Sequence, residues 1–312
     1  MHSKRIVIPG AAGLVGQNLI LLLKEQGYAN IIAIDKHPQN TATLRELHPD
    51  ITVVEADISR EGEWQSLLQA GDVLVMLQAQ IGSKASDDFV RNNIRSTELM
   101  LETANKAGIE YLVHISSSVV ESVADDDYTN TKKEQERMVL ESGLPYCVLR
   151  PTLMFGWFDS KHLGWLSRFM QNIPVFPIPG HGRYMRQPLY VKDFCKIIIA
   201  CVEKQPANKI YDITGKEEID YVDIIREIRK SVKSRTFILH IPYRLFWILL
   251  KVWAVFDSDP PFTADQLKAL VACDEFDVID WDKIFDVKPT PFAEAIKETF
   301  QHPVYSKYIL KF

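Results

Sequence analysis

Three side chains near the middle of the chain have the types and spacing needed to exchange a proton with a hydroxyl group. Tyr128 and Lys132 are four residues apart, so a helix would place them on one face, one turn from each other. A free tyrosine has a pKa of about 10, and a nearby positive charge lowers it, which would make the phenol a usable base near neutral pH. Ser118 ends a serine run ten residues earlier and could hold the substrate oxygen meanwhile. We therefore predict Tyr128, Lys132 and Ser118 as catalytic residues.

A Tyr-x-x-x-Lys spacing is common on solvated helix faces, so its meaning depends on what lies upstream. A short apolar run, Ile6-Val7-Ile8, leads directly into the glycine-rich segment 10–16, GAAGLVG. Glycine permits a tight turn and a close approach to a pyrophosphate, and the N-terminus of a following helix offers free N–H groups to it. The residues predicted to contact the cofactor here are Gly10, Ala12, Gly13, Leu14, Val15 and Gly16.

A second apolar run over 31–34 ends in Asp35, about 20 positions beyond the glycines. An acidic side chain at that place can accept hydrogen bonds from the adenosine ribose hydroxyls and would repel a 2′-phosphate. We therefore expect NAD as the cofactor. The adjacent Lys36, also predicted at the cofactor, and His37 could attract a phosphate, so NADP remains the alternative.

Further apolar runs predict strands over 51–57, 73–77 and 111–115, with a long helix over about 86–107. Strands that alternate with helices predict an α/β fold, a Rossmann-type doubly wound parallel sheet, whose ligands lie beyond the carboxyl ends of the strands. Besides Tyr128 and Lys132, the cofactor contacts expected at those ends are Asp57, Leu77, Gln78, Ala79 and Ser116.

The chain is long enough for such a domain and a smaller partner. We expect residues 1–155 to form the NAD-binding domain, a segment of about 183–213 to return to it, and residues 156–312 to form mainly a substrate-binding domain. The segment 157–182 is rich in aromatic residues, glycine and proline, which fits a pocket wall and ordinary packing equally well.

Net charge and cysteine spacing indicate which partners and which cellular compartment to expect. The 312 residues carry a formal net charge of −5 without a basic stripe, so we expect no nucleic-acid partner. The four cysteines form no Cys-x-x-Cys pair and have no histidine spacing suited to zinc, so we expect no metal site and a reducing, cytoplasmic location. These cysteines are Cys147, Cys195, Cys201 and Cys273.

Together these motifs resemble the extended short-chain dehydrogenase/reductase superfamily, in particular its NAD-dependent nucleotide-sugar epimerase/dehydratase family, of which this chain looks like an atypical member. The resemblance extends over most of the chain, including the glycine turn, the serine run, Tyr-x-x-x-Lys and the segment 186–193, RQPLYVKD. It implies bound NAD, a nucleotide-sugar substrate and a homodimer. The residue roles that it implies are Asp57 and Ile58 at the adenine, Asn93 and Pro151 at the cofactor, Thr152 at the substrate, and Arg186 at the substrate diphosphate.

The chain departs from this family's pattern in the catalytic region. Nine residues separate Ser118 from Tyr128, where typical members have a loop more than twice as long. The family's dehydratases have Thr-Asp-Glu where this chain has Ser-Val-Val at 118–120, which disfavours dehydration. Three functions remain: an epimerase with a transient keto-sugar, an NAD(P)-dependent dehydrogenase or reductase of a hydrophobic alcohol or ketone, and a non-catalytic dinucleotide-binding scaffold.

The segment 245–256, LFWILLKVWAVF, is almost entirely apolar. Twelve residues are too few to span a bilayer as a helix. Four interpretations stay open: an interfacial helix that touches a membrane, with Arg244 and Lys251 on its polar side, a wall for a lipid-like substrate, a subunit contact, and a helix buried against its own domain.

Overall fold

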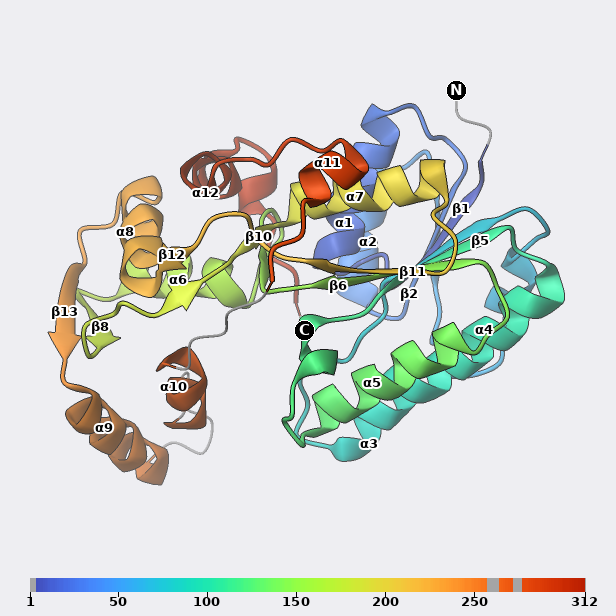
Figure 1. Cartoon of the computed structure of the whole chain (residues 1–312). Coiled ribbons are helices and arrows are strands. Elements are labelled where there is room, and N and C mark those ends of the chain that lie inside the picture. The colour runs from blue at the N-terminus through green and yellow to red at the C-terminus, as the bar shows by residue number, and fades with distance from the viewer. Residues whose placement is uncertain (1–3, 257–263, 272–276, 312) are drawn as a thin grey trace.

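The computed structural model describes residues 4–256, 264–271 and 277–311, which form two lobes (Figure 1). The first lobe is built on a parallel seven-stranded sheet with the order β11-β6-β5-β4-β1-β2-β3. The strand order reverses between β1 and β4, and ligands of such sheets bind beyond the strand ends at that point. The strands are β1 (Ile6–Pro9), β2 (Ile31–Asp35), β3 (Thr52–Glu55), β4 (Val73–Met76), β5 (Tyr111–Ile115), β6 (Tyr146–Pro151) and β11 (Lys209–Ile213).

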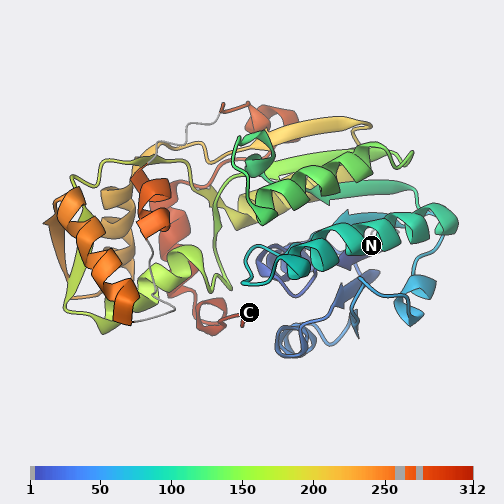
Figure 2. The same ribbon diagram turned by 90° about the horizontal axis from the view of Figure 1, so that it is seen from below.

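Helices cover both faces of this sheet, and the predicted Rossmann-type fold is confirmed. Ile6 and Ile8 of β1 pack toward one group of helices and Val7 toward the other, because successive strand residues point to opposite faces. One face carries α1 (Leu14–Glu25), α2 (Pro38–Leu47), α7 (Val191–Lys204) and α11 (Trp281–Phe285). The other carries η1 (Glu63–Leu67), α4 (Ser96–Ala107) and α5 (Asp127–Leu140), and α4 and α5 run side by side (Figure 2).

The single long helix expected over about 86–107 has three parts in the structure. They are α3 (Ser86–Phe89), the π-helical η2 (Val90–Arg95) and α4. A π-helical turn accommodates an extra residue in the helix, and such turns are frequent at functional sites. Here it orients Asn92 and Asn93 toward the segment that follows β4.

The second lobe packs three helices around a core of its own. Its elements are α6 (His162–Asn172), β8 (Val175–Pro179), β9 (Met185–Arg186), β12 (Ile219–Asp220), α8 (Tyr221–Ser231), β13 (Phe237–Ile241), α9 (Tyr243–Phe256), α10 (Ala264–Val271) and α12 (Phe292–Gln301). Strand β8 pairs with β13 and β9 pairs with β12, while α6, α8 and α12 enclose the core.

The chain passes between the lobes several times. A short parallel pair, β7 (Met154–Phe155) and β10 (Leu189–Tyr190), lies between β6 and α7. After η4 (Tyr305–Lys307), the C-terminal segment returns to the first lobe, where the backbone N–H of Lys311 donates to Asn40. Trp157 and Phe158 are buried against this segment, so these two aromatic residues of 157–182 serve packing rather than a pocket wall.

Two further features bear on the sequence analysis. Cys147, Cys195 and Cys201 are buried free thiols, and Cys273 lies outside the described residues. Among the helices of the described segments, α9 included, none is both long and apolar enough to cross a membrane.

Candidate active site

The turn between β1 and α1 is packed so tightly that it requires glycine. Gly10 has a φ of +78°, and a Cβ there would lie 2.5 Å from the backbone nitrogen of Gln78. A Cβ on Gly16 would lie 2.2 Å from the carbonyl oxygen of Ala11. Gly13 caps α1 without any side chain, which leaves N–H groups of the first helical turn available to an anion. This cradle fits the pyrophosphate of a dinucleotide.

Asp35 ends β2 beside this turn. Its carboxylate accepts hydrogen bonds from the backbone N–H groups of Ala12 and His37, both at 3.0 Å. Burial raises the pKa of Asp35, and these hydrogen bonds oppose the rise. The ammonium of Lys36 donates to Asn92 at 2.5 Å and is therefore directed toward η2. Asp35 at the end of β2 would repel the 2′-phosphate of NADP, and the neighbouring Lys36 is bound to Asn92. Both features support NAD over NADP.

Tyr128 lies near the serine run that follows β5. Asp126 caps α5 by accepting a hydrogen bond from Thr129 N–H at 2.9 Å, and Tyr128 lies in the first turn of that helix. Burial raises the pKa of the Tyr128 phenol, while a hydrogen bond with the Ser117 side chain lowers it in part. Ser117, which the sequence analysis passed over, is thus the serine whose side chain affects the pKa of the phenol. Ser118 begins the short helix η3 (Ser118–Glu121), and its catalytic role remains a prediction.

Lys132 is fully enclosed one turn further along α5, with 1% of its surface exposed. Its ammonium donates to the carbonyl oxygen of Ile115 at 3.0 Å and to Gln135 Oε1 at 2.5 Å. Burial lowers the pKa of Lys132 to about 7, although the charge of Glu136 opposes the shift. The structure therefore differs from the expectation that this lysine lowers the pKa of Tyr128: the phenol's pKa is raised because burial outweighs the stabilising contacts.

Two polar clusters that the sequence analysis did not identify hold these groups in place. Gln135 also donates to Thr97 Oγ1 at 2.9 Å, which links α5 to α4. Asn93 is fully buried, accepts from Gln80 N–H at 2.6 Å and donates to Thr131 Oγ1 at 3.0 Å. Asn93 therefore positions the segment after β4, on which Gln78 and Ala79 lie.

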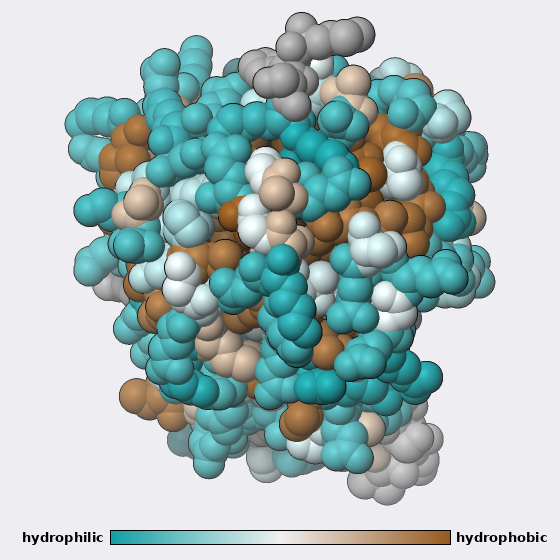
Figure 3. All heavy atoms as spheres, turned by 90° about the vertical axis from the view of Figure 1, so that its right-hand side faces the viewer, coloured by the Kyte–Doolittle hydropathy of each residue, from teal (hydrophilic) through white to brown (hydrophobic). Residues whose placement is uncertain are grey.

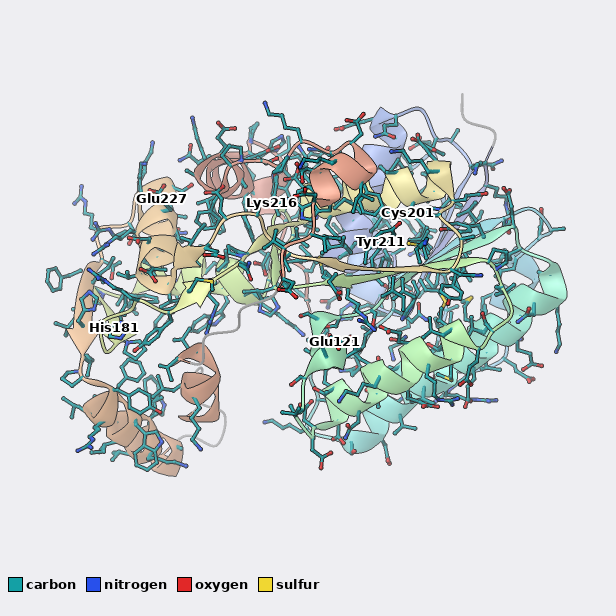
Figure 4. The ribbon with its side chains drawn as sticks, in the orientation of Figure 1. Glu121, His181, Cys201, Tyr211, Lys216 and Glu227 are labelled. Carbon is teal, nitrogen blue, oxygen red and sulfur yellow. The ribbon has the colours of Figure 1, made fainter. Side chains whose placement is uncertain are left out.

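Ser116 faces away from Tyr128 and belongs to a buried ionic cluster. Its hydroxyl donates to Glu136 at 2.5 Å, and the guanidinium of Arg150 binds the same carboxylate at 2.5 Å through Nη2. Arg150 also pairs with Glu121 of η3, the nearest acid after the serine run, which is labelled in Figure 4. The Glu121 carboxylate is therefore paired with Arg150, so η3 presents no unpaired acidic side chain beside Tyr128.

The other predicted cofactor and substrate residues occupy the strand ends. Asp57 accepts from the backbone and hydroxyl of Ser59, and Ile58 is buried toward α4. Leu77 N–H donates to the Pro9 carbonyl, which fixes the end of β4 to the end of β1. Pro151 ends β6, and the buried Thr152 hydroxyl donates to the Gln187 carbonyl at 3.1 Å. Their contacts with ligands remain predictions.

Arg186 lies in the second lobe, on β9. Its guanidinium donates to the carbonyl oxygen of Met185 at 2.8 Å and to that of Leu270 on α10. It therefore connects two elements of the second lobe, whereas Tyr128 and Lys132 belong to the first lobe. A substrate contacted by both would lie between the lobes.

The buried ammonium of Lys132 predicts a pH-dependent stability. Between pH 7 and its ordinary pKa of 10.5, the unfolded state binds a proton that the folded state releases, so folding becomes more favourable as pH rises. One proton bound only by the unfolded state changes the free energy of unfolding by about 1.4 kcal/mol per pH unit. Between about pH 7.5 and 9, the free energy of unfolding of the wild type should therefore rise by about 2 kcal/mol relative to that of Lys132→Met. Urea unfolding of both proteins at several pH values measures this gain.

His114, the other buried base near Lys132, does not contribute to that pH-dependent difference in the free energy of unfolding. Burial holds its pKa well below its ordinary value, so it is neutral in both states above about pH 7.5. Parallel stability curves for wild type and Lys132→Met would show that Lys132 keeps an ordinary pKa.

Comparisons with known proteins agree with this geometry. A family model described as the NAD dependent epimerase/dehydratase family matches residues 6–214. UDP-N-acetyl-alpha-D-glucosaminuronate decarboxylase of Bacillus cytotoxicus is 23% identical over 96% of this chain and 97% of its own. A 4-hydroxy-2-methyl-3-oxo-4-farnesyl-3,4-dihydroquinoline-1-oxide ketoreductase of Stigmatella aurantiaca is 23% identical over 77% of each chain.

A solved structure shows the same fold over nearly the whole length. The UDP-glucuronic acid 4-epimerase from Bacillus cereus, in complex with UDP-glucuronic acid and NAD, superimposes with a TM-score of 0.73 at 21% identity. The match covers 96% of this chain and 98% of that one.

Proposed function

This chain belongs to the NAD-dependent epimerase/dehydratase family and is thus an NAD-using enzyme, and we propose that it epimerises a nucleotide sugar through a transient keto-sugar. One observation carries the proposal: Tyr128, partly buried in the first turn of α5, lies one turn from the enclosed Lys132 and near the serine run after β5, in the lobe that also holds the glycine cradle. A sugar hydroxyl placed between the phenol and the serine run would have a hydrogen-bond partner and a proton acceptor.

Each residue of the site would have its own role in the reaction. Bound at the turn 10–16 and Asp35, NAD would supply a reversible acceptor for the hydride on the reacting carbon. As the phenolate, Tyr128 Oη would take the proton of the sugar hydroxyl as the hydride leaves the same carbon, and as the phenol it would return that proton to the same oxygen when the hydride comes back, while Ser117 Oγ orients that oxygen. Lys132, with a pKa of about 7, would hold a proton near the phenol that both steps can use. The reaction has no net redox change.

The second lobe would bind the nucleotide diphosphate half of the substrate. Arg186 supports this because a guanidinium fork matches a diphosphate, and its hydrogen-bond partners include backbone carbonyls of β9 and α10. The class of substrate is a UDP- or dTDP-linked sugar, as the names of similar proteins suggest.

Arg186→Gln tests that role. We expect the KM for the nucleotide sugar to rise by about tenfold or more with a smaller change in kcat, since a charged hydrogen bond to a bound anion is lost. The matched control is Arg226→Gln on the same lobe, whose exposed guanidinium pairs with Asp223 at 2.7 Å. Equal KM values for the two variants would remove Arg186 from the substrate site.

A second function has one observation in its favour. The Stigmatella aurantiaca relative is named as a ketoreductase of a farnesyl-bearing ring, and α9 of this chain exposes apolar side chains in the substrate-side lobe. A net reductase of a hydrophobic ketone would use the same tyrosine and serine. The two functions differ in redox stoichiometry, because only the reductase consumes one NAD(P)H per turnover.

The first experiment is to denature the purified protein and identify released dinucleotide and sugar nucleotide by mass spectrometry. Retained NAD(H) followed by interconversion of a UDP- or dTDP-sugar without net NADH would support the epimerase. A protein that purifies empty, prefers NADPH and oxidises it stoichiometrically with a hydrophobic ketone would replace the epimerase by the reductase.

A further inference from the structure

Helix α9 exposes a continuous apolar stripe. Its members are each 48–51% exposed and follow the spacing i, i+3, i+4, i+7, i+8, which places them on one face of the helix. They are Leu245, Ile248, Leu249, Val252 and Trp253, which we call the α9 stripe. A helix that is packed only within its own protein normally turns such a stripe inward.

The stripe is not the face by which α9 packs on its lobe. Phe246 and Leu250 are 8% exposed and contact Leu267 of α10, with Ile241 and Val271 at the margin of this contact. Helix α9 is therefore apolar on two sides. One side completes the second lobe, and the α9 stripe remains outside the contact.

Basic residues border the α9 stripe, and the segment 228–256 contains no acidic residue. Arg244 and Lys251 are seven residues apart on one edge of the stripe, and the Lys251 ammonium lies 5.6 Å from the centre of the Trp247 ring. From Ile228 to Phe256 the sequence contains no Asp or Glu, whereas the whole chain has a net charge of −5. The basic residues in this segment are Arg229, Lys230, Lys233, Arg235, Arg244 and Lys251.

The apolar surface continues from α9 onto the strand before it. Phe237 and Leu239 of β13 are 63% and 43% exposed, and β13 leads into α9 at the outer end of the second lobe (Figure 1). The opposite end of the molecule is covered mainly by hydrophilic side chains (Figure 3). The apolar and basic character is thus concentrated at one end.

We propose that the α9 stripe docks on the surface of a bilayer that contains anionic lipids. Apolar and tryptophan side chains on one face with arginine and lysine at its edge are the chemistry of a helix that lies in the headgroup region. At 14 residues, or about 21 Å at 1.5 Å per residue, α9 would lie along the surface. A second copy of this chain fits less well, because it would bring two sets of the same basic residues together.

Vesicle flotation of the full chain tests the proposal, using phosphatidylcholine vesicles with and without about one-third phosphatidylglycerol. We expect binding to the anionic vesicles that weakens with added salt. Leu249→Glu, and separately Arg244→Gln combined with Lys251→Gln, should each lower the bound fraction by roughly tenfold. Val304→Glu is the matched control, because Val304 is similarly exposed at 46% but lies outside the second lobe's apolar end.

The outcomes separate this proposal from the enzymatic one. Retained NAD and thermal stability in each variant, measured alongside, show that the fold is intact. No flotation of the wild type, or equal flotation of wild type and Leu249→Glu, would overturn the membrane contact while leaving the proposed activity untouched. Light scattering that shows Leu249→Glu converting a dimer into a monomer, without vesicle binding by either protein, would instead assign the α9 stripe to a subunit contact.

Discussion

Tyr128→Phe is expected to lower kcat by about a thousandfold, because it removes the group that exchanges the substrate's proton and leaves the phenyl ring in its packing. The Tyr128 side chain is partly buried and phenylalanine keeps the same ring, so the variant loses a hydroxyl without opening a cavity. NAD should stay bound, since the glycine cradle and Asp35 are unaffected. Steady-state rates with the substrate found by mass spectrometry, together with the released NAD per protein, measure both quantities.

Tyr308→Phe is the matched control for that variant. It makes the same chemical change at a tyrosine whose hydroxyl donates to Glu46 on the surface of the first lobe. We expect wild-type kcat and NAD content. Full activity in Tyr128→Phe with NAD still bound would eliminate Tyr128 as the acid–base group and favour a dinucleotide-binding scaffold.

Gly10→Ala is expected to cost about 2–5 kcal/mol of stability and to lower NAD affinity by at least tenfold, from a strained backbone and overpacking. Gly10 has a φ of +78°, which L-amino acids rarely adopt. The new Cβ would meet backbone atoms of Leu77 and Gln78 at 2.5–2.8 Å, so the ends of β1 and β4 must separate. Both ends belong to the predicted cofactor site. Urea unfolding and NAD titration of the variant measure the two losses.

Gly27→Ala separates the two causes of that loss. Gly27 has a φ of +87°, but a Cβ there has no atom within 4 Å. We expect a loss of about 1–2 kcal/mol from the backbone conformation alone, with normal NAD binding. If both variants lost the same stability and both kept NAD, the close approach of Gly10 to β4 would have no bearing on the cofactor.

Much of the fold was predictable because it depends on local pattern. The apolar runs at β1, β2 and β5 were assigned with correct bounds or nearly so, since burial on both faces of a parallel sheet leaves continuous apolar strands. The π-helical turn at 90–95 was not predicted. Asn92 and Asn93 of this turn contact Gln80 of the segment after β4, and no local sequence pattern encodes that contact.

The serine run shows where sequence reasoning ended. Ser116, Ser117 and Ser118 have identical side chains, and the catalytic role was predicted for Ser118 from its place at the end of the run. In the structure the Ser116 hydroxyl donates to Glu136, and it is the Ser117 side chain that lowers the pKa of Tyr128, because successive extended residues face opposite ways before the chain turns into η3. The register of that turn relative to α5 decides which hydroxyl meets the phenol.

The sequence alone determined the class of fold, the dinucleotide turn, the acidic residue after β2 and the tyrosine–lysine pair, because each is a motif whose spacing carries its chemistry. Only the tertiary structure decided the electrostatics and the surfaces. Lys132 has a pKa of about 7 because β5 and α5 exclude water from it, and α9 has an exposed stripe because α10 covers only its other side. Burial and packing arise from segments far apart in the chain, and no local pattern contains them.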